Sequence, residues 1–306
     1  MWTMYTFIIK KYLPTKGGDK LNIGDLKRTA KARMSGNWGA GIGGYWLVIL
    51  LTVVVSIPET VLYFVQGGYS PLYWILYYGT IIFIINHLST GLAWMHLDIF
   101  DGFKGKVATI FTPFKQYARV LGVTFLIILF TFLWTLLFVI PGIIKGIAYS
   151  QAIFLVREYP NMGVLEAITE SRRIMNGHKG RYFLLNLSFI GWVIVPIILI
   201  TAGSLLLVAA IIDSGATLET LEVYLARDPY LLAQAGIAFL LIFVGIIYTI
   251  AISFYFAPYY STTISGFYRD LMNRVNPQAP DGEMPFEPHA NQTMNTTSSE
   301  SSFYQQ

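Results

Sequence analysis

The chain has 306 residues, of which 55% are hydrophobic and only 12% are charged. A soluble domain usually carries about 25% charged residues, so this chain could not cover a soluble surface and much of its solvent must be lipid. It has no cysteine, which excludes disulfides, thiolate metal sites and cysteine nucleophiles. The net charge of +4 comes without a basic run interleaved with aromatics, so no nucleic-acid partner is expected.

The segment 1–37 is expected to lie in the cytoplasm. Its apolar start precedes its first lysines, the reverse of the order in a signal peptide, so we predict an interfacial anchor or a loose terminus and no cleaved signal. Residues 24–36 predict a basic amphipathic helix suited to the headgroup layer. Leu26, Ala30 and Met34 form its apolar face.

Six apolar stretches in the region 38–272 are candidates to cross a bilayer core of about 30 Å, which needs roughly 20 apolar residues. They are 40–65, 72–96, 118–140, 143–158, 182–212 and 233–257. The fourth is short and follows the third with only Pro141 and Gly142 between, a pair that breaks helices and permits a tight turn. The fourth stretch is therefore either a span or a re-entrant piece.

The distribution of basic residues favours six spans, because cytoplasmic loops carry the excess of Lys and Arg. With six spans and the N-terminus inside, all Lys and Arg except Lys145 and Arg227 lie on the inner side. If the fourth stretch does not cross, the basic residues between spans four and five move outside. The sequence therefore predicts an all-α, polytopic transmembrane bundle of a bacterial cell membrane, with both termini in the cytoplasm.

The inner segments resemble one another, which indicates an internal repeat. Residues 162–176 form a second amphipathic pattern, and similar segments precede spans one, three and five. We predict three hairpins, each introduced by an inner interfacial amphipathic helix, as repeats are common in transporter folds. The segment 273–306 becomes rich in Pro, Ser, Thr and Asn and is expected to be a disordered cytoplasmic tail.

Polar residues inside the apolar stretches are candidate site residues, because ionisable groups cost several kcal/mol there. Asn86 and His87 lie near the middle of span two, and Asn186 lies about one turn into span five, ahead of Pro196. His87 could contact a proton or a ligand. The alternative, which we favour, is a hydrogen bond between helices worth about 0.6 kcal/mol.

Two charged groups of residues are further candidates. Glu59 and Lys145 could form an ion pair at the outer ends of spans one and four, although both could instead extend to water. A basic inner patch is expected to contact anionic headgroups, at about 1 kcal/mol per residue, or else a membrane or cytoplasmic protein. The patch consists of Arg172, Arg173, His178, Lys179 and Arg181.

Catalytic and metal-binding motifs are missing from the sequence. The four histidines have no ligand spacing, and neither His-Glu-x-x-His nor Gly-x-Ser-x-Gly occurs. We therefore expect no enzyme activity, no cofactor and no metal.

Four segments resemble an uncharacterised family of bacterial integral membrane proteins, catalogued as domain of unknown function 975. They are Lys31–Trp38, Pro141–Ser150, Ala167–Lys179 and Leu187–Trp192. The resemblance runs from about 20 to 272 and implies a six-span bacterial membrane protein without an established activity. Residues 94–98 depart from the Arg-Gly-Glu-like segment expected there.

Three functions are compatible with this sequence. The first is a non-enzymatic scaffold, regulatory or assembly protein that rests on the bilayer and its anionic headgroups. The second is a small-molecule or lipid transporter whose path is lined by Asn86, His87, Asn186 and Pro196. A membrane-embedded enzyme is third. A polar cavity that contains His87 would separate the second function from the first.

Single introduced cysteines test the topology, because the natural chain has none. Cysteines at Gly68 and Ser214 should react with an impermeant maleimide in intact cells, whereas one at Gly177 should react only after the membrane is opened. Labelling of Gly177→Cys in intact cells would overturn the six-span topology.

Overall fold

The computed structural model of this protein describes residues 22–66, 70–214 and 228–275, which are helical with no strand among them. Six helical segments are long and apolar enough to cross a membrane, so the predicted all-α, six-span class is confirmed. They are Trp38–Val65, Pro71–Phe100, Val107–Leu137, Val139–Glu158, Ile190–Ile212 and Pro229–Val275. The predictions for the first 21 residues and for 276–306 lie outside the described residues.

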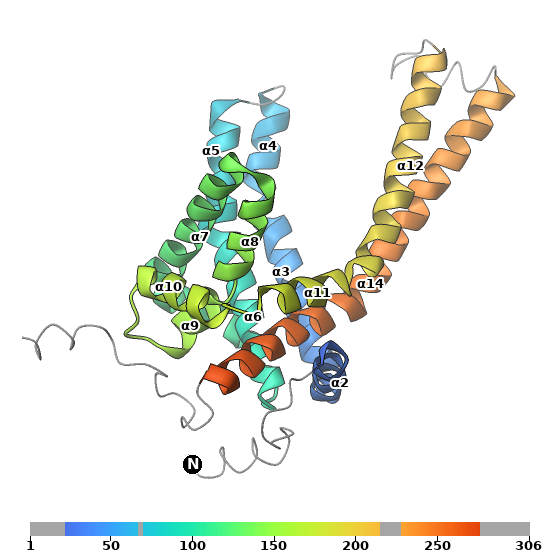
Figure 1. Ribbon diagram of the computed structural model, residues 1–306. Coiled ribbons are helices and arrows are strands. Elements are labelled where there is room, and N and C mark those ends of the chain that lie inside the picture. The colour runs from blue at the N-terminus through green and yellow to red at the C-terminus, as the bar shows by residue number, and fades with distance from the viewer. Residues whose placement is uncertain (1–21, 67–69, 215–227, 276–306) are drawn as a thin grey trace, which may run out of the picture.

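The helices form two groups above a shared base (Figure 1). α3 to α8 make one bundle, α12 and the outer half of α14 lean away from it as a pair, and the inner half of α14 crosses the base. In chain order the helices are α2 (Ile23–Met34), α3 (Trp38–Val55), α4 (Ile57–Val65), α5 (Pro71–Thr80), the π-helix η1 (Ile81–Ile85), α6 (Asn86–Phe100), the 3-10 helix η2 (Val107–Gln116), α7 (Tyr117–Leu137), α8 (Val139–Tyr149), α9 (Ala152–Glu158), α10 (Val164–Ile174), α11 (Lys179–Leu187), α12 (Ile190–Ser214) and α14 (Pro229–Val275).

The turn between α7 and α8 lies earlier than predicted. The chain reverses at Phe138, whose backbone is extended, and Pro141 lies inside the first turn of α8. Proline is tolerated there because its missing N–H has no partner in a first turn. Gly142 allows the two helices to meet, since a Cβ on it would lie 2.1 Å from Oγ1 of Thr135.

The fifth and sixth spans also differ from the prediction. The stretch 182–212 is not one helix, because α11 ends at Leu187 and α12 begins at Ile190. The sixth helix does not end near 257, because α14 continues through Pro258 to Val275. Hydropathy marks only the lipid-facing part of α14; its inner part is covered by protein, with Phe267 fully buried.

The two inner amphipathic helices cover protein with their apolar faces. In α2 the side chains of Leu26, Ala30 and Met34 have no exposed surface, and α2 contacts α6 and α14. In α10 Ile168 and Ile174 are buried, and α10 contacts α7, α8 and α9. These faces were predicted to rest on lipid. The interfacial position of both helices and the three-hairpin repeat stay predictions.

Partly buried ion pairs at the base of the bundle join the ends of spans two, four and six. The Arg269 guanidinium donates to both carboxylate oxygens of Asp101, at 2.7 and 2.6 Å, and also pairs with Glu158. The Tyr268 hydroxyl donates to the same Glu158 carboxylate. These contacts hold Tyr268 and Arg269 of α14 against the C-terminal ends of α6 and α9.

A second set of ion pairs extends this base to its neighbours. Arg157 at the end of α9 pairs with Asp98 of α6. Asp270 of α14 pairs with Arg181 of α11, with 2.5 Å between Oδ2 and Nη1, and with Arg274 one turn further along α14. Charge pairing therefore connects α6, α9, α11 and α14 at one end of the molecule.

Removal of Arg269 tests this base. Arg269→Ala leaves the partly buried Asp101 and Glu158 without a counter-charge. The Arg269 side chain is 22% exposed, so the free energy of unfolding should fall by about 1–3 kcal/mol, less than for a fully buried pair. The measurement is an SDS unfolding titration of the purified protein.

The matched control for Arg269→Ala is Arg28→Ala. Arg28 pairs with Asp25 at the surface, where its side chain is 81% exposed, and such pairs are worth about 0–1 kcal/mol. Equal losses in the two variants would show that the buried pairs do not hold the base together.

Candidate functional site

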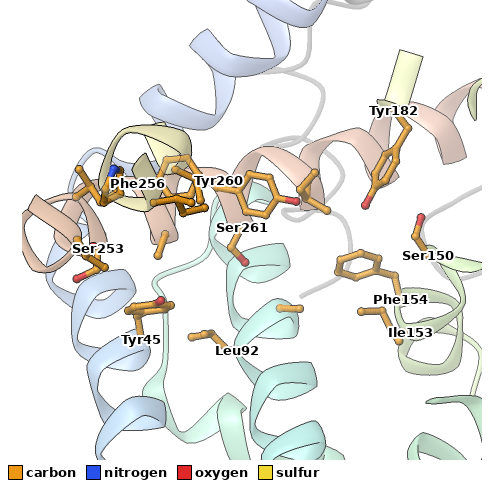
Figure 2. A pocket seen from close by; sticks show the side chains of 18 of the residues that line it. Tyr45, Leu92, Ser150, Ile153, Phe154, Tyr182, Ser253, Phe256, Tyr260 and Ser261 are labelled. Atoms are coloured by element: carbon orange, nitrogen blue, oxygen red, sulfur yellow. The ribbon is translucent and has the colours of Figure 1, made fainter. Parts of the chain in front are cut away.

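A cavity of about 690 Å³ lies where the α12–α14 pair meets the rest of the protein (Figure 2). Its walls come from α3, α6, α9, α11, α12 and α14, and most of its lining side chains are apolar, including Leu92, Ile153, Phe154, Ile197 and Phe256. Ligand pockets typically measure about 300–1,000 Å³ and are mainly apolar with a few placed polar groups. The cavity is therefore large enough to hold a small molecule or part of a lipid.

The α12–α14 pair that forms one wall is closely packed within itself. Gly203 of α12 lies so near α14 that a Cβ on it would be 2.8 Å from the backbone oxygen of Ala238. Small residues permit such close contact between helices in a membrane. The pair therefore forms the wall as a unit, and Pro196 of α12 is part of that wall.

The polar groups of the cavity are hydroxyls. They belong to Tyr45, Ser150, Tyr182, Thr249, Ser253, Tyr260 and Ser261. Among the described residues that line the cavity, none carries a formal charge at neutral pH. Ligand recognition in this cavity would therefore rest on apolar contact and on neutral hydrogen bonds.

Three of these hydroxyls converge at the end of the cavity next to α11, which we call the hydroxyl cluster: Ser150, Tyr182 and Tyr260 (Figure 2). The Tyr260 hydroxyl donates to Oδ1 of Asn186 at 2.6 Å. The Asn186 amide nitrogen donates in turn to the backbone oxygen of Tyr182 at 2.8 Å. Asn186 therefore holds the Tyr260 hydroxyl in place, although Asn186 does not itself line the cavity.

The break between α8 and α9 positions Ser150. Its hydroxyl donates to the backbone oxygen of Ile147 at 2.9 Å and accepts from the Gln151 amide nitrogen at 2.7 Å. Gln151 has no exposed surface, and its Oε1 has no hydrogen-bond partner. Burial raises the pKa of Tyr182, so its hydroxyl keeps its proton.

His87 does not line this cavity. The sequence offered it as a contact for a proton or ligand or, as the favoured alternative, as a hydrogen bond between helices. It is fully buried, its ring stacks on Tyr117 at 4.2 Å between centroids, and Nε2 lies 3.2 Å from the Tyr117 backbone oxygen. Asn86 does not line the cavity either. The structure therefore separates Asn86 and His87 from Asn186, and His87 occupies a packed helix contact.

The predicted outer ion pair between Glu59 and Lys145 is not present among the described ion pairs. The Lys145 ammonium instead lies 4.3 Å from the centre of the Trp134 ring. Glu59 is buried, and its Oε2 has no hydrogen-bond partner. The sequence placed both residues at the outer ends of their helices, but it could not give their directions around the helix axes.

Two arginines of the predicted basic patch form ion pairs within the protein. Arg173 pairs with Glu170 of the same helix, which raises the pKa of Arg173, and Arg181 pairs with Asp270. Arg172 is exposed, and Lys179 is half-buried. The surface available to anionic headgroups is therefore smaller than predicted.

Sequence reasoning did not find the hydroxyl cluster. Its three residues come from segments far apart in the chain, and serine and tyrosine are common near membrane interfaces. Only tertiary packing brings them together. Among the described residues no group of three or more His, Asp or Glu side chains could hold a metal ion.

Residues 135–275 match the family described as "Protein of unknown function (DUF975)". The family resemblance inferred from the sequence is thereby confirmed over this stretch, which contains Ser150, Tyr182 and Tyr260. No curated protein and no solved structure matches the chain. The family brings no activity with it, so the function has to be argued from the site.

Substitution of His87 tests its separation from the cavity. His87→Phe keeps an aromatic ring against Tyr117 and removes one hydrogen bond, so stability should fall by only about 0.6 kcal/mol. His87→Ala also leaves a void and should cost roughly 2 kcal/mol or more. SDS unfolding gives both values. Photolabelling of the cavity by an apolar probe should be unchanged in both variants. Reduced labelling in a folded His87→Phe protein would place His87 in the site.

Proposed function

We propose that this protein is a non-enzymatic lipid-binding protein of the bacterial cell membrane that serves a scaffold, regulatory or assembly role. The cavity of about 690 Å³ carries this proposal, because its lining is mainly apolar and its polar groups are neutral hydroxyls. The acyl or alkyl chain of a lipid needs only apolar contact and is present at high concentration around the α12–α14 pair. The cavity is thus matched to the most abundant apolar ligand of its surroundings.

The lining chemistry favours binding over ion-coupled transport or catalysis. A proton-coupled transporter uses ionisable side chains along its path, and acid–base catalysis uses a positioned acid or base. The lining has hydroxyls alone, and His87 lies in a helix contact elsewhere. Lipid binding requires only apolar contacts and neutral hydrogen bonds, which the lining of the cavity provides.

The orientation and the headgroup contacts belong to the same proposal. Both termini lie in the cytoplasm, as the distribution of Lys and Arg favours. Exposed basic side chains at the base, among them Lys31, Lys104 and Arg172, then contact anionic headgroups of the inner leaflet. A membrane or cytoplasmic protein would be the scaffolded partner.

Lipid transport is the second candidate function, and the position of the cavity favours it. The cavity lies between the α12–α14 pair and the remaining helices, and transporters often move one helix group against another around a bound substrate. Transfer of a fluorescent lipid between the leaflets of proteoliposomes would distinguish transport from binding.

Filling the cavity tests lipid binding. Ala257 lines the cavity from α14, so Ala257→Trp should reduce crosslinking of a diazirine-bearing hexadecane to cavity peptides at least severalfold, because the indole occupies the chain's volume. Peptide mass spectrometry of the protein in nanodiscs measures this yield.

The control for Ala257→Trp is Ala251→Trp, on the same helix. Ala251 is exposed and does not line the cavity, so this variant should crosslink as the natural protein does. Absence of cavity crosslinks in the natural protein, or equal yields in both variants, would refute lipid binding in this cavity.

A further inference from the structure

The hydrogen-bonding state of the hydroxyl cluster restricts what the cavity can bind. The Ser150 hydrogen is donated to the Ile147 backbone oxygen, and the Tyr260 hydrogen is donated to Asn186. A hydroxyl has one hydrogen to donate and two lone pairs. Neither hydroxyl therefore has a hydrogen left for a ligand. The Tyr260 oxygen keeps its lone pairs, whereas those of Ser150 are taken by the Gln151 amide nitrogen and by Tyr182.

A nearby buried acceptor strengthens this imbalance. Ser150 accepts from Nε2 of Gln151, whereas Oε1 of the same amide is buried without a partner. Tyr182, the remaining member of the cluster, has Ser150, Asn186 and Gln151 as its hydrogen-bonding neighbours. The Ser150 hydrogen already goes to Ile147, so Tyr182 donates its single hydrogen to Ser150. No hydroxyl of the cluster therefore has a hydrogen left to donate to a ligand.

We infer that the hydroxyl cluster is a recognition site for the free hydroxyl group of a long-chain neutral lipid. The lipid alcohol donates its hydrogen to the Tyr260 oxygen, and its alkyl chain occupies the apolar part of the cavity. This inference rests on the proposed lipid binding and adds the chemical class of the ligand: a fatty alcohol or a diacylglycerol-like lipid, both of which carry a hydroxyl on a long chain.

Other lipid headgroups fit the cluster less well. A fatty acid carboxylate would bring a negative charge and further lone pairs against the acceptors of Ser150 and Tyr260. An ester or ether oxygen accepts hydrogen bonds but cannot donate one. An ammonium group can donate, but burial without a counter-charge is costly, and the described lining holds no carboxylate.

Competition against a photoprobe tests the inference in the natural protein. The probe is a diazirine-bearing hexadecanol bound to the full chain in nanodiscs, and crosslinks are counted on cavity peptides. Hexadecanol and dioleoylglycerol should compete about five- to tenfold better than hexadecyl methyl ether or palmitate, the factor expected for one hydrogen bond of about 1–1.4 kcal/mol. The methyl ether keeps the oxygen and lacks only the hydrogen.

A pair of tyrosine variants locates the effect. Tyr260→Phe removes the acceptor and keeps the ring, so the preference for hexadecanol over its methyl ether should disappear. Tyr45→Phe is the matched control: it removes the same group, and Tyr45 also lines the cavity but lies away from the hydroxyl cluster (Figure 2). This variant should keep the preference.

The outcomes separate this inference from the proposed function. If the diazirine-bearing hexadecane crosslinks to the cavity but hexadecanol and its methyl ether compete equally, the cavity binds chains and hydroxyl recognition is wrong. Stronger competition by palmitate, or loss of the preference in Tyr45→Phe alone, would also overturn it. If no apolar probe reaches the cavity, both proposals fail. Should Tyr260→Phe not fold, the comparison of alcohol and ether in the natural protein still decides.

Discussion

The partly buried charge of Arg269 is the constraint on which the rest of the structure depends. It pairs with Asp101 and Glu158 at the ends of spans two and four, so the inner half of α14 must lie across the base of the bundle. Without these partners, partial burial of the charge would be costly. The position of Arg269 therefore sets the direction in which the outer half of α14 leaves the base. α12 follows the same direction because it packs along α14.

The cavity is a consequence of that geometry. α14 contacts α2, α3 and α6 on one side and α12 along its outer half, so the cavity forms between the two helix groups. Helix breaks at this level put Ser150, Tyr182 and Tyr260 beside one another (Figure 2). Apolar volume and neutral hydroxyls then suit a lipid with a polar oxygen, whereas a charged solute would find no partner in the lining.

Hydropathy and charge were sufficient to predict the all-α class and the six spans, because the bilayer imposes length and composition directly. They failed where protein replaces lipid as the surroundings. α14 continues to Val275 because its inner half is buried by protein, and the chain turns at Phe138 because Pro141 can occupy a first helical turn. Of the predicted polar residues only Asn186 supports the cavity, since directions around a helix axis depend on tertiary packing.

The most direct test of lipid-alcohol binding is a cryo-electron microscopy map of the protein in nanodiscs that contain dioleoylglycerol. We expect an elongated density between the α12–α14 pair and α6, ending within hydrogen-bond distance of the Tyr260 hydroxyl. A map in which α12 closes against α6 and fills the cavity, or in which the density ends away from this cluster, would contradict the account.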